Sequence, residues 1–262
     1  MMTLTDTHSH IYDEAFDADR DEAIARARSA GVKYMLLPAI DSDSHKALFA
    51  TCRKYPEICL PMMGLHPTSV NDNMSWREEL ALVEDLLASP PTGRFYAIGE
   101  VGLDLHWSQE YLAEQTEAFE KQIELSIEYD LPLVIHTRDA WPEMLNILDK
   151  YKTKGIRGVM HSFSGSLDDY RAILSKGDFA FGIGGPVTYK KSPLPEVVAD
   201  MDLSRILLET DCPYLPPVPF RGKRNESSYL TCICEKVAEA KGISTEKVAE
   251  NTTANARRIF GF

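Results

Sequence analysis

The sequence predicts an α/β fold, a TIM-type (β/α)8 barrel with an extra C-terminal helix. The chain has 262 residues, which is close to the size of one such barrel. Short, continuously apolar segments, typical of buried parallel strands, alternate with longer helical patterns along the chain. Eight strand–helix units follow one another, and eight parallel strands close into a barrel. We therefore expect residues 1–262 to form a single domain.

The order of the apolar and amphipathic segments gives the expected elements. The eight strands are expected at residues 4–7, 34–39, 59–64, 95–99, 132–136, 158–161, 179–183 and 205–208. The helices that follow them are expected at residues 19–29, 44–54, 76–87, 112–129, 140–151, 167–175, 194–199 and 227–240. A ninth helical pattern, at residues 245–260, is expected to close the barrel.

A doubly wound open sheet is the alternative fold for strands and helices in this order. Such a sheet usually carries a glycine-rich phosphate loop after its first strand. Here the first apolar segment is followed by His8, Ser9 and His10, without a glycine. The barrel is therefore the preferred prediction.

The composition predicts a cytoplasmic protein without a membrane segment. Hydrophobic residues make up 44% of the chain, and no apolar run approaches the roughly 20 residues that a membrane span needs. The N-terminus lacks a basic segment followed by an apolar one, so no signal peptide is expected. The five cysteines are expected to be free thiols in a reducing compartment. Cys232 and Cys234, spaced C-x-C within a predicted helix, are expected to be structural.

Functional residue types gather at the ends of the predicted strands. In a barrel of parallel strands, the chemistry takes place at the carboxyl ends of the strands. Residues two apart on a strand face the same side, so His8 and His10 can bind one ion. The residues that end or follow the other strands are His66 after the third, Glu100 and Asp104 after the fourth, His136 and Arg138 after the fifth, His161 after the sixth, and Glu209 and Asp211 after the eighth.

A shared metal site would explain why these histidines and carboxylates lie on one rim. Mixed nitrogen and oxygen ligands suit zinc, manganese, iron or magnesium. A carboxylate such as Glu100 can bridge two ions, and paired ions are the usual means of cleaving phosphoesters. The fourth strand has no lysine for carbamylation, which argues against a cyclic amidase. His45 and His106 do not lie at strand ends. His45 is left out of the expected site, whereas His106 follows Asp104 closely and could be a loop residue near it.

Contact with nucleic acid is expected to be local, because the net charge is −12 and proteins that grip duplex DNA over a wide face are usually basic. The loop after the eighth strand carries Arg221, Lys223, Arg224 and Asn225, and a helix follows it. Such a cluster alone is usually a solvated loop, but this one lies on the rim of the expected metal site. Arg138 can bind phosphate through its planar guanidinium.

Seven sequence motifs resemble those of the TatD-type deoxyribonucleases, and together they run from about residue 6 to residue 255. They are the segments 6–10, 64–67, 99–104, 132–138, 161–165, 209–211 and 221–226. The resemblance implies a (β/α)8 barrel that binds two or more divalent ions (Mg, Mn or Zn) and hydrolyses phosphodiester bonds in DNA. It further implies an exonuclease that acts from the 3′ end of single-stranded or frayed DNA.

The resemblance also implies roles for individual residues. One ion would be held by His8, His10, Glu100 and Asp211, and the second by Glu100, His136 and His161. Asp211 would bind an ion, orient the attacking water, or do both. Substrate would be bound by His66, Arg138, Arg221, Lys223 and Asn225, and the ligands would be supported by Glu209 and Asp104.

Three other functions remain open at this stage. The same ions could serve hydrolysis of another ester, such as an aminoacyl ester on RNA. A small phosphoester could replace the polymer, since the acidic surface is compatible with it. A barrel with a purely structural metal is the third alternative. We expect DNA to be the substrate, no membrane partner, and a monomer.

Overall fold

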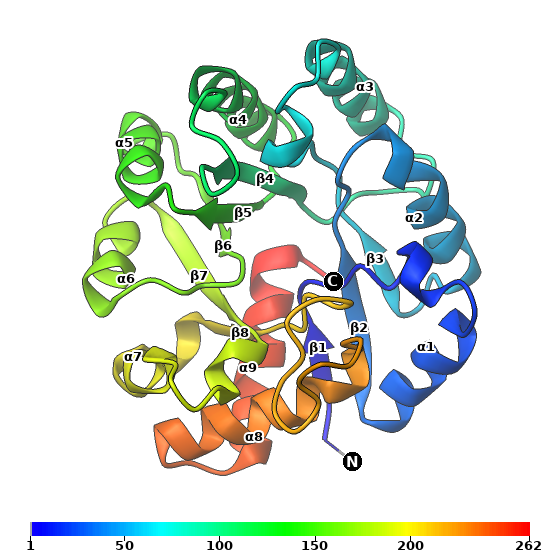
Figure 1. Ribbon diagram of the computed structural model, residues 1–262, viewed down its shortest axis with the longest axis vertical. Helices are drawn as coiled ribbons and strands as arrows, with labels where there is room; N and C mark the ends of the chain where they lie inside the picture. Colours follow the sequence, from blue (N-terminus) through cyan, green and yellow to red (C-terminus); the bar gives the residue numbers. More distant parts are fainter. Residues whose placement is uncertain (1) are drawn as a thin grey trace.

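The computed structural model describes residues 2–262 and contains eight strands, all paired in parallel, and nine α-helices (Figure 1). The strands are β1 (Leu4–Asp6), β2 (Val32–Leu37), β3 (Cys59–Pro61), β4 (Ile98–Asp104), β5 (Leu133–Arg138), β6 (Arg157–Met160), β7 (Asp178–Ile183) and β8 (Ile206–Leu208). The helices are α1 (Arg20–Ser29), α2 (Ser42–Lys54), α3 (Trp76–Ala88), α4 (Leu112–Glu128), α5 (Trp141–Tyr151), α6 (Leu167–Leu174), α7 (Leu194–Asp200), α8 (Leu230–Lys241) and α9 (Thr245–Phe260).

Backbone hydrogen bonds beside the strands close the barrel at two seams. The strands form two groups, β1–β2–β3 and β4–β5–β6–β7–β8. At the first seam, Met63 donates to the carbonyl of Ala97 over 3.1 Å and accepts from the amide of Gly99 over 2.9 Å. At the second seam, the amide of Thr7 donates to the carbonyl of Leu208 over 3.0 Å. The ring is therefore closed, which confirms the predicted barrel and excludes the open sheet.

Helix α9 covers the end of the barrel where the strands begin. Apolar side chains from six strands, and from Ala97 just before β4, meet inside the barrel, and three side chains of α9 pack against them. In Figure 1, α9 lies within the ring formed by α1–α8. The cluster consists of Leu36, Leu60, Met62, Ala97, Val134, Val159, Ala180, Leu207, Ala256, Ile259 and Phe260. We call it the barrel floor; it leaves the opposite end of the barrel as the open face.

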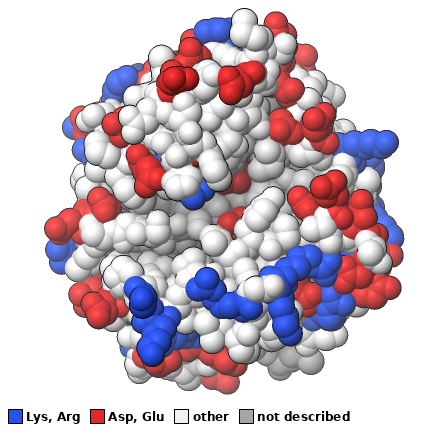
Figure 2. Space-filling model, viewed as in Figure 1, with Lys and Arg blue, Asp and Glu red and all other residues white. Residues whose placement is uncertain are grey.

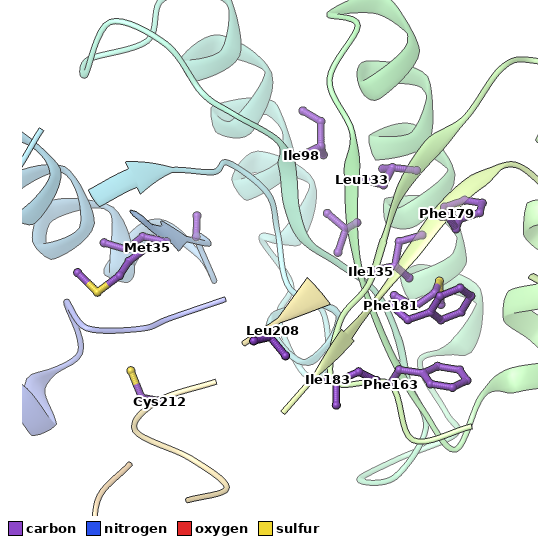
Figure 3. Close-up of a cluster of buried hydrophobic side chains, with 14 of the residues drawn as sticks. Met35, Ile98, Leu133, Ile135, Phe163, Phe179, Phe181, Ile183, Leu208 and Cys212 are labelled. Atoms are coloured by element: carbon purple, nitrogen blue, oxygen red, sulfur yellow. The ribbon is translucent and has the colours of Figure 1, made fainter. Parts of the chain in front are cut away.

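The other face of each strand packs against the surrounding helices. Neighbouring residues on a strand point to opposite sides, so Met35 and Leu37 of β2 pack outward while Leu36 belongs to the barrel floor. Figure 3 shows part of this outer core, where Phe163 and Phe181 lie close together. Their ring centroids are 4.9 Å apart in an edge-to-face arrangement. This packing fixes the strand ends that carry the site.

Strand β4 differs most from its predicted bounds, because it begins at Ile98 and continues to Asp104. The prediction ended this strand at Gly99, where the apolar run stops. The chain nevertheless stays paired with β5 through two glycines. Gly102 has a φ of +133°, and a Cβ there would lie 2.1 Å from the carbonyl oxygen of His136. Glycine therefore lets the strand continue, and Glu100 lies within β4.

Two further expectations concern membrane segments and cysteines. Within residues 2–262, no helix combines the length and the apolar character that crossing a membrane requires. All five cysteines are free thiols, and only Cys232 is partly exposed. No cysteine of the described chain belongs to a group of side chains close enough to bind a metal. Cys232 and Cys234 lie in α8, as predicted.

Candidate active site

A cavity of about 1010 Å³ opens at the carboxyl end of the strands. Figure 2 shows it as a hollow at the centre of the face, with acidic atoms on its floor. Ligand-type side chains converge there from six different strand ends. The lining includes His10, His66, Glu100, Asp104, His136, His161 and Asp211, together with apolar residues such as Phe163, Pro186, Leu194 and Leu215.

Glu100 stands at the centre of this cluster and is only 3% exposed. Its Oε2 atom lies 3.1 Å from Nε2 of His8, and its Oε1 atom lies 3.0 Å from Nδ1 of His136. Oε1 also lies 3.4 Å from Nε2 of His66 and 3.6 Å from Nε2 of His161. The two oxygens of one carboxylate therefore face two separate groups of imidazoles.

His10 and Asp211 complete the cluster on the side of His8. The Nε2 atoms of His8 and His10 are 3.2 Å apart, as expected for residues two apart that face one side. Asp211 Oδ1 lies 3.5 Å from Nε2 of His10 and 3.7 Å from Nε2 of His161. The six residues expected as ligands therefore converge on one site.

The donor set fits divalent metal ions. Three groups of side chains have ligand atoms within 4.8 Å of one another. They are His8–His10–Asp211, His8–Glu100–His161 and His66–Glu100–His136. Imidazole nitrogens and carboxylate oxygens turned toward a common point are the ligands that zinc or manganese takes. His161 lies between the two sides of the cluster, because its ring stacks on that of His8 while its Nε2 lies 3.6 Å from the Glu100 oxygen that faces His136. His66 lies beside His136.

The two central carboxylates are ionised. Burial alone would raise the pKa of Glu100, but the charges of His66, His8 and His161 outweigh it and hold the pKa well below its usual range. The pKa of Asp211 is also lowered, because His161 and the hydrogen bond to His10 outweigh the effect of burial. Both groups therefore present negative oxygens to a cation near neutral pH.

Two further carboxylates hold the ligand histidines. Asp104 Oδ2 lies 2.9 Å from Nε2 of His136, and Glu209 Oε1 lies 2.9 Å from Nδ1 of His161. Burial alone would lower the pKa of both imidazole rings. Hydrogen bonds to Asp104 and Glu100 nevertheless raise the pKa of His136 to about 8. The charges of Glu209, Glu100 and Asp211 raise the pKa of His161 to about 10. Such carboxylate–histidine pairs fix the orientation of a metal ligand.

The backbone of Asp211 is held in a conformation that non-glycine residues rarely adopt, with a φ of +57°. Its amide donates to the carbonyl of His8 over 2.9 Å. One residue earlier, Thr210 donates from its amide and its hydroxyl to the buried carboxylate of Asp6, over 2.8 and 2.6 Å. These bonds join the ends of β8 and β1 and fix the place of the Asp211 side chain.

Tyr12 is a site residue that the sequence analysis missed. Its hydroxyl lies 3.1 Å from Nδ1 of His10 and donates to the carbonyl of Pro38 over 2.6 Å. A hydroxyl that donates to a carbonyl accepts from Nδ1–H, which leaves Nε2 of His10 free to bind an ion. A tyrosine two residues beyond the His8–His10 pair was the available signal.

The expected phosphate-binding residues divide into two groups. Arg138 is exposed and lines the cavity, with its guanidinium 5.4 Å from the centre of the Trp107 ring. Arg221 and Lys223 are exposed on the loop between β8 and α8. These three side chains are free to meet a substrate, although only Arg138 lines the cavity itself.

The expectation for Asn225 is corrected by the structure. Asn225 is fully buried, and its side-chain amide donates to the carbonyls of Thr210 and Tyr214 over 2.7 and 2.6 Å. It therefore holds the loop in place and has no surface left for a substrate. Arg224 is likewise engaged, because both of its terminal nitrogens donate to Asp19.

Known proteins resemble this chain over almost its whole length. The sequence profile of the family described as TatD related DNase matches residues 5–261. An uncharacterized metal-dependent hydrolase of Bacillus subtilis, YabD, is 38% identical over 98% of both chains. A 3′-5′ ssDNA/RNA exonuclease TatD of Cronobacter sakazakii is 36% identical over 98% of this chain and 97% of its own.

Solved structures resemble the fold as a whole. The TatD homologue YJJV of Escherichia coli K12 has a TM-score of 0.90 at 27% identity, over 99% of this chain and 98% of its own. A hydrolase of the TatD family from Entamoeba histolytica has a TM-score of 0.84 over 99% of this chain and 98% of its own, at 21% identity. At that identity the second likeness supports the fold alone.

Proposed function

Because this chain belongs to the TatD family of metal-dependent hydrolases, we propose that it cleaves phosphodiester bonds in DNA as an exonuclease. It would act from the 3′ end of single-stranded or frayed strands. The observation that carries the proposal is Glu100, whose two oxygens face separate groups of imidazoles within one open cavity. Curated relatives named 3′-5′ ssDNA/RNA exonucleases support the substrate class.

The residues that would hold two divalent ions follow from the geometry. His8, His10 and Asp211 would bind one ion, with Glu100 as a shared ligand between the two. His136 and Glu100 would bind the second, with His66 and His161 close enough to contribute. Divalent ions in such a site neutralise charge on the scissile phosphate and favour ionisation of the attacking water.

Asp211 is the residue placed to manage the proton of that water. Its carboxylate is ionised, lies on the cavity wall, and is held by its own backbone hydrogen bonds. The water oxygen bonds to phosphorus as the water gives a proton to Asp211, and one bridging phosphorus–oxygen bond breaks. The leaving alkoxide takes up a proton from solvent, to which Asp211 returns its own. The products are a phosphomonoester and an alcohol. Arg138, at the cavity wall, would bind the oxygens of a phosphate through its guanidinium.

A digestion series tests the proposal. The purified protein would be loaded with Mg²⁺, Mn²⁺ or Zn²⁺ and given 3′-blocked DNA, 5′-blocked DNA, RNA and an activated phosphodiester. Cleavage of the 5′-blocked strand with little cleavage of the 3′-blocked strand is the expected result. Turnover of the activated phosphodiester without turnover of any nucleic acid would instead favour a small phosphoester substrate.

A further inference from the structure

Four exposed cations stand on one part of the cavity rim, and we call them the cation strip: Lys190, Lys191, Arg221 and Lys223. The two lysines follow the short 3-10 helix η3 (Gly185–Thr188), after β7. The other two lie on the loop between β8 and α8. Figure 2 shows Lys and Arg side chains gathered along the lower edge of the central hollow, over this region of Figure 1.

Contacts between the two segments hold the cation strip together. The guanidinium of Arg221 lies 4.1 Å from the centre of the Tyr189 ring. The Tyr189 hydroxyl donates to the carbonyl of Pro216 over 3.1 Å, and the amide of Val218 donates to Oγ1 of Thr188 over 2.8 Å. The two halves of the strip therefore form one surface, although they are separated in sequence.

The cation strip borders the cavity directly. Pro186 and Leu194, which lie on either side of the two lysines in sequence, both line the cavity, and so does Leu215. The backbones of the two segments touch here, because a Cβ on Gly185 would lie 2.0 Å from the carbonyl oxygen of Leu215. A strand that left the cavity on this side would pass over the strip.

The charges of the strip are available to a ligand. Among residues 2–262, none of its four side chains forms an ion pair with a carboxylate, whereas the neighbouring Arg224 pairs with Asp19 over 2.7 Å. A different part of the rim is acidic, since Asp13 and Glu14, between β1 and α1, and Asp43, in the first turn of α2, line the cavity. Phosphates would be repelled there and attracted over the strip.

We propose that the cation strip binds the sugar-phosphate backbone of a single-stranded nucleic acid, on the part of the strand that extends beyond the cleavage site. The inference rests on the proposed function and adds the path of the polymer to it. Lys190 and Lys191 are assigned here to substrate binding, from a loop that carries none of the motifs found in the sequence. Short substrates that end within the cavity would not reach the strip.

The test compares a Lys190→Ser/Lys191→Ser variant with a matched Lys33→Ser/Lys247→Ser control. The two control lysines are also exposed, on β2 and α9 at the barrel-floor end. The readout is the ratio of kcat/KM for a long single-stranded oligonucleotide to kcat/KM for an activated phosphodiester, at several salt concentrations. Each contact between a cation and a phosphate of a single strand adds a slope of about −0.7 to the log–log salt dependence.

For the parent protein, with four contacts, the ratio should fall roughly 50-fold when the salt concentration rises from about 50 to 200 mM. For the variant, which keeps two contacts, the ratio should fall roughly 7-fold over the same range. The expected result is therefore a shallower salt dependence and a lower ratio for the Lys190→Ser/Lys191→Ser variant, with the control like the parent. An unchanged ratio and slope in that variant would overturn the inference. Failure of the proposed function is distinct, because the parent protein itself would then not cleave the oligonucleotide.

Discussion

Oε1 of Glu209 lies 2.9 Å from Nδ1 of His161, while Nε2 of the same ring faces Glu100 and Asp211. Glu209 also accepts the amide of Ser162 over 2.6 Å, so the carboxylate is fixed in place. A carboxylate on Nδ1 keeps the proton on that nitrogen and turns Nε2 toward an ion. Support of His161 by Glu209 therefore stays a prediction that a metal-binding experiment can test.

Replacing Glu209 should weaken metal binding without removing a ligand atom. Glu209→Ala should lower metal affinity about 10- to 100-fold, the usual effect of losing a residue that orients a ligand. Gly182→Ala should act in the same direction, because its Cβ would lie 1.9 Å from Oε2 of Glu209. Competition with a chelator measures the affinity, and Glu78→Ala, on an exposed position of α3, is the control. Equal affinities in all variants would contradict the role of Glu209.

Glu100 should matter to both ions, and His136 mainly to one. Glu100→Ala removes the carboxylate that faces both imidazole groups, so bound metal should fall by about two ions per chain and turnover should be lost. His136→Ala should release about one ion, since Glu100 remains together with His8, His10 and Asp211 to hold the other. Elemental analysis of dialysed protein gives the stoichiometry. The same loss in both variants would argue against a bridging position for Glu100.

Single-stranded or frayed ends should be cut faster than intact duplex. The ligand cluster lines a cavity, and the chain carries a net charge of −12. A flexible end can bring one phosphate to the site, whereas a rigid duplex would press many phosphates against acidic surface. Exposed Trp107 and Tyr214 line the cavity and offer faces on which a terminal base can stack. The measurement compares initial rates of cleavage on matched single-stranded and blunt duplex oligonucleotides. Faster cleavage within the duplex than at a free single-stranded end would contradict the prediction.

Alkylation of the native protein should modify Cys232 first. Burial raises the pKa of Cys52, Cys212 and Cys234 to about 12, so at pH 8 almost none of these thiols is a reactive thiolate. Cys59 is buried as well, whereas Cys232 is partly exposed. Intact mass after iodoacetamide should show one adduct per folded chain and five after unfolding in urea. Early labelling of Cys212 would mean that the seam beside Asp211 opens.

The fold and the metal cluster could be predicted because both depend on regular patterns. Parallel strands place their carboxyl ends on one rim of the barrel. The convergence of His8, His136, His161 and Asp211 could therefore be predicted from their positions at the ends of the predicted strands. The end of β4 could not be predicted, because two glycines interrupt the apolar run there while the backbone pairing with β5 continues. The bounds of a strand are set by its neighbours, and glycine spacing does not reveal them.

The roles of loop residues could not be predicted for a different reason. Asn225 and Arg224 looked like part of a phosphate-binding loop, but their partners, Thr210 and Asp19, are brought to them only by the folded chain. His66 follows β3 by several residues, and its approach to Glu100 depends on the path of that loop. Hydrogen-bond partners far apart in sequence leave no local pattern to read.

The barrel floor has a consequence for how the chain reaches its native state during synthesis. Side chains of six strands meet there, and the helix that shields them comes last, at Thr245–Phe260. The pairing of Thr7 with Leu208 also joins the first strand to the last. Domains generally fold as units while the ribosome delivers them from the N-terminus. For this chain, a nascent polypeptide that has emerged only as far as α8 still presents an apolar opening to the cell, so chaperone binding should be strongest just before α9 is released.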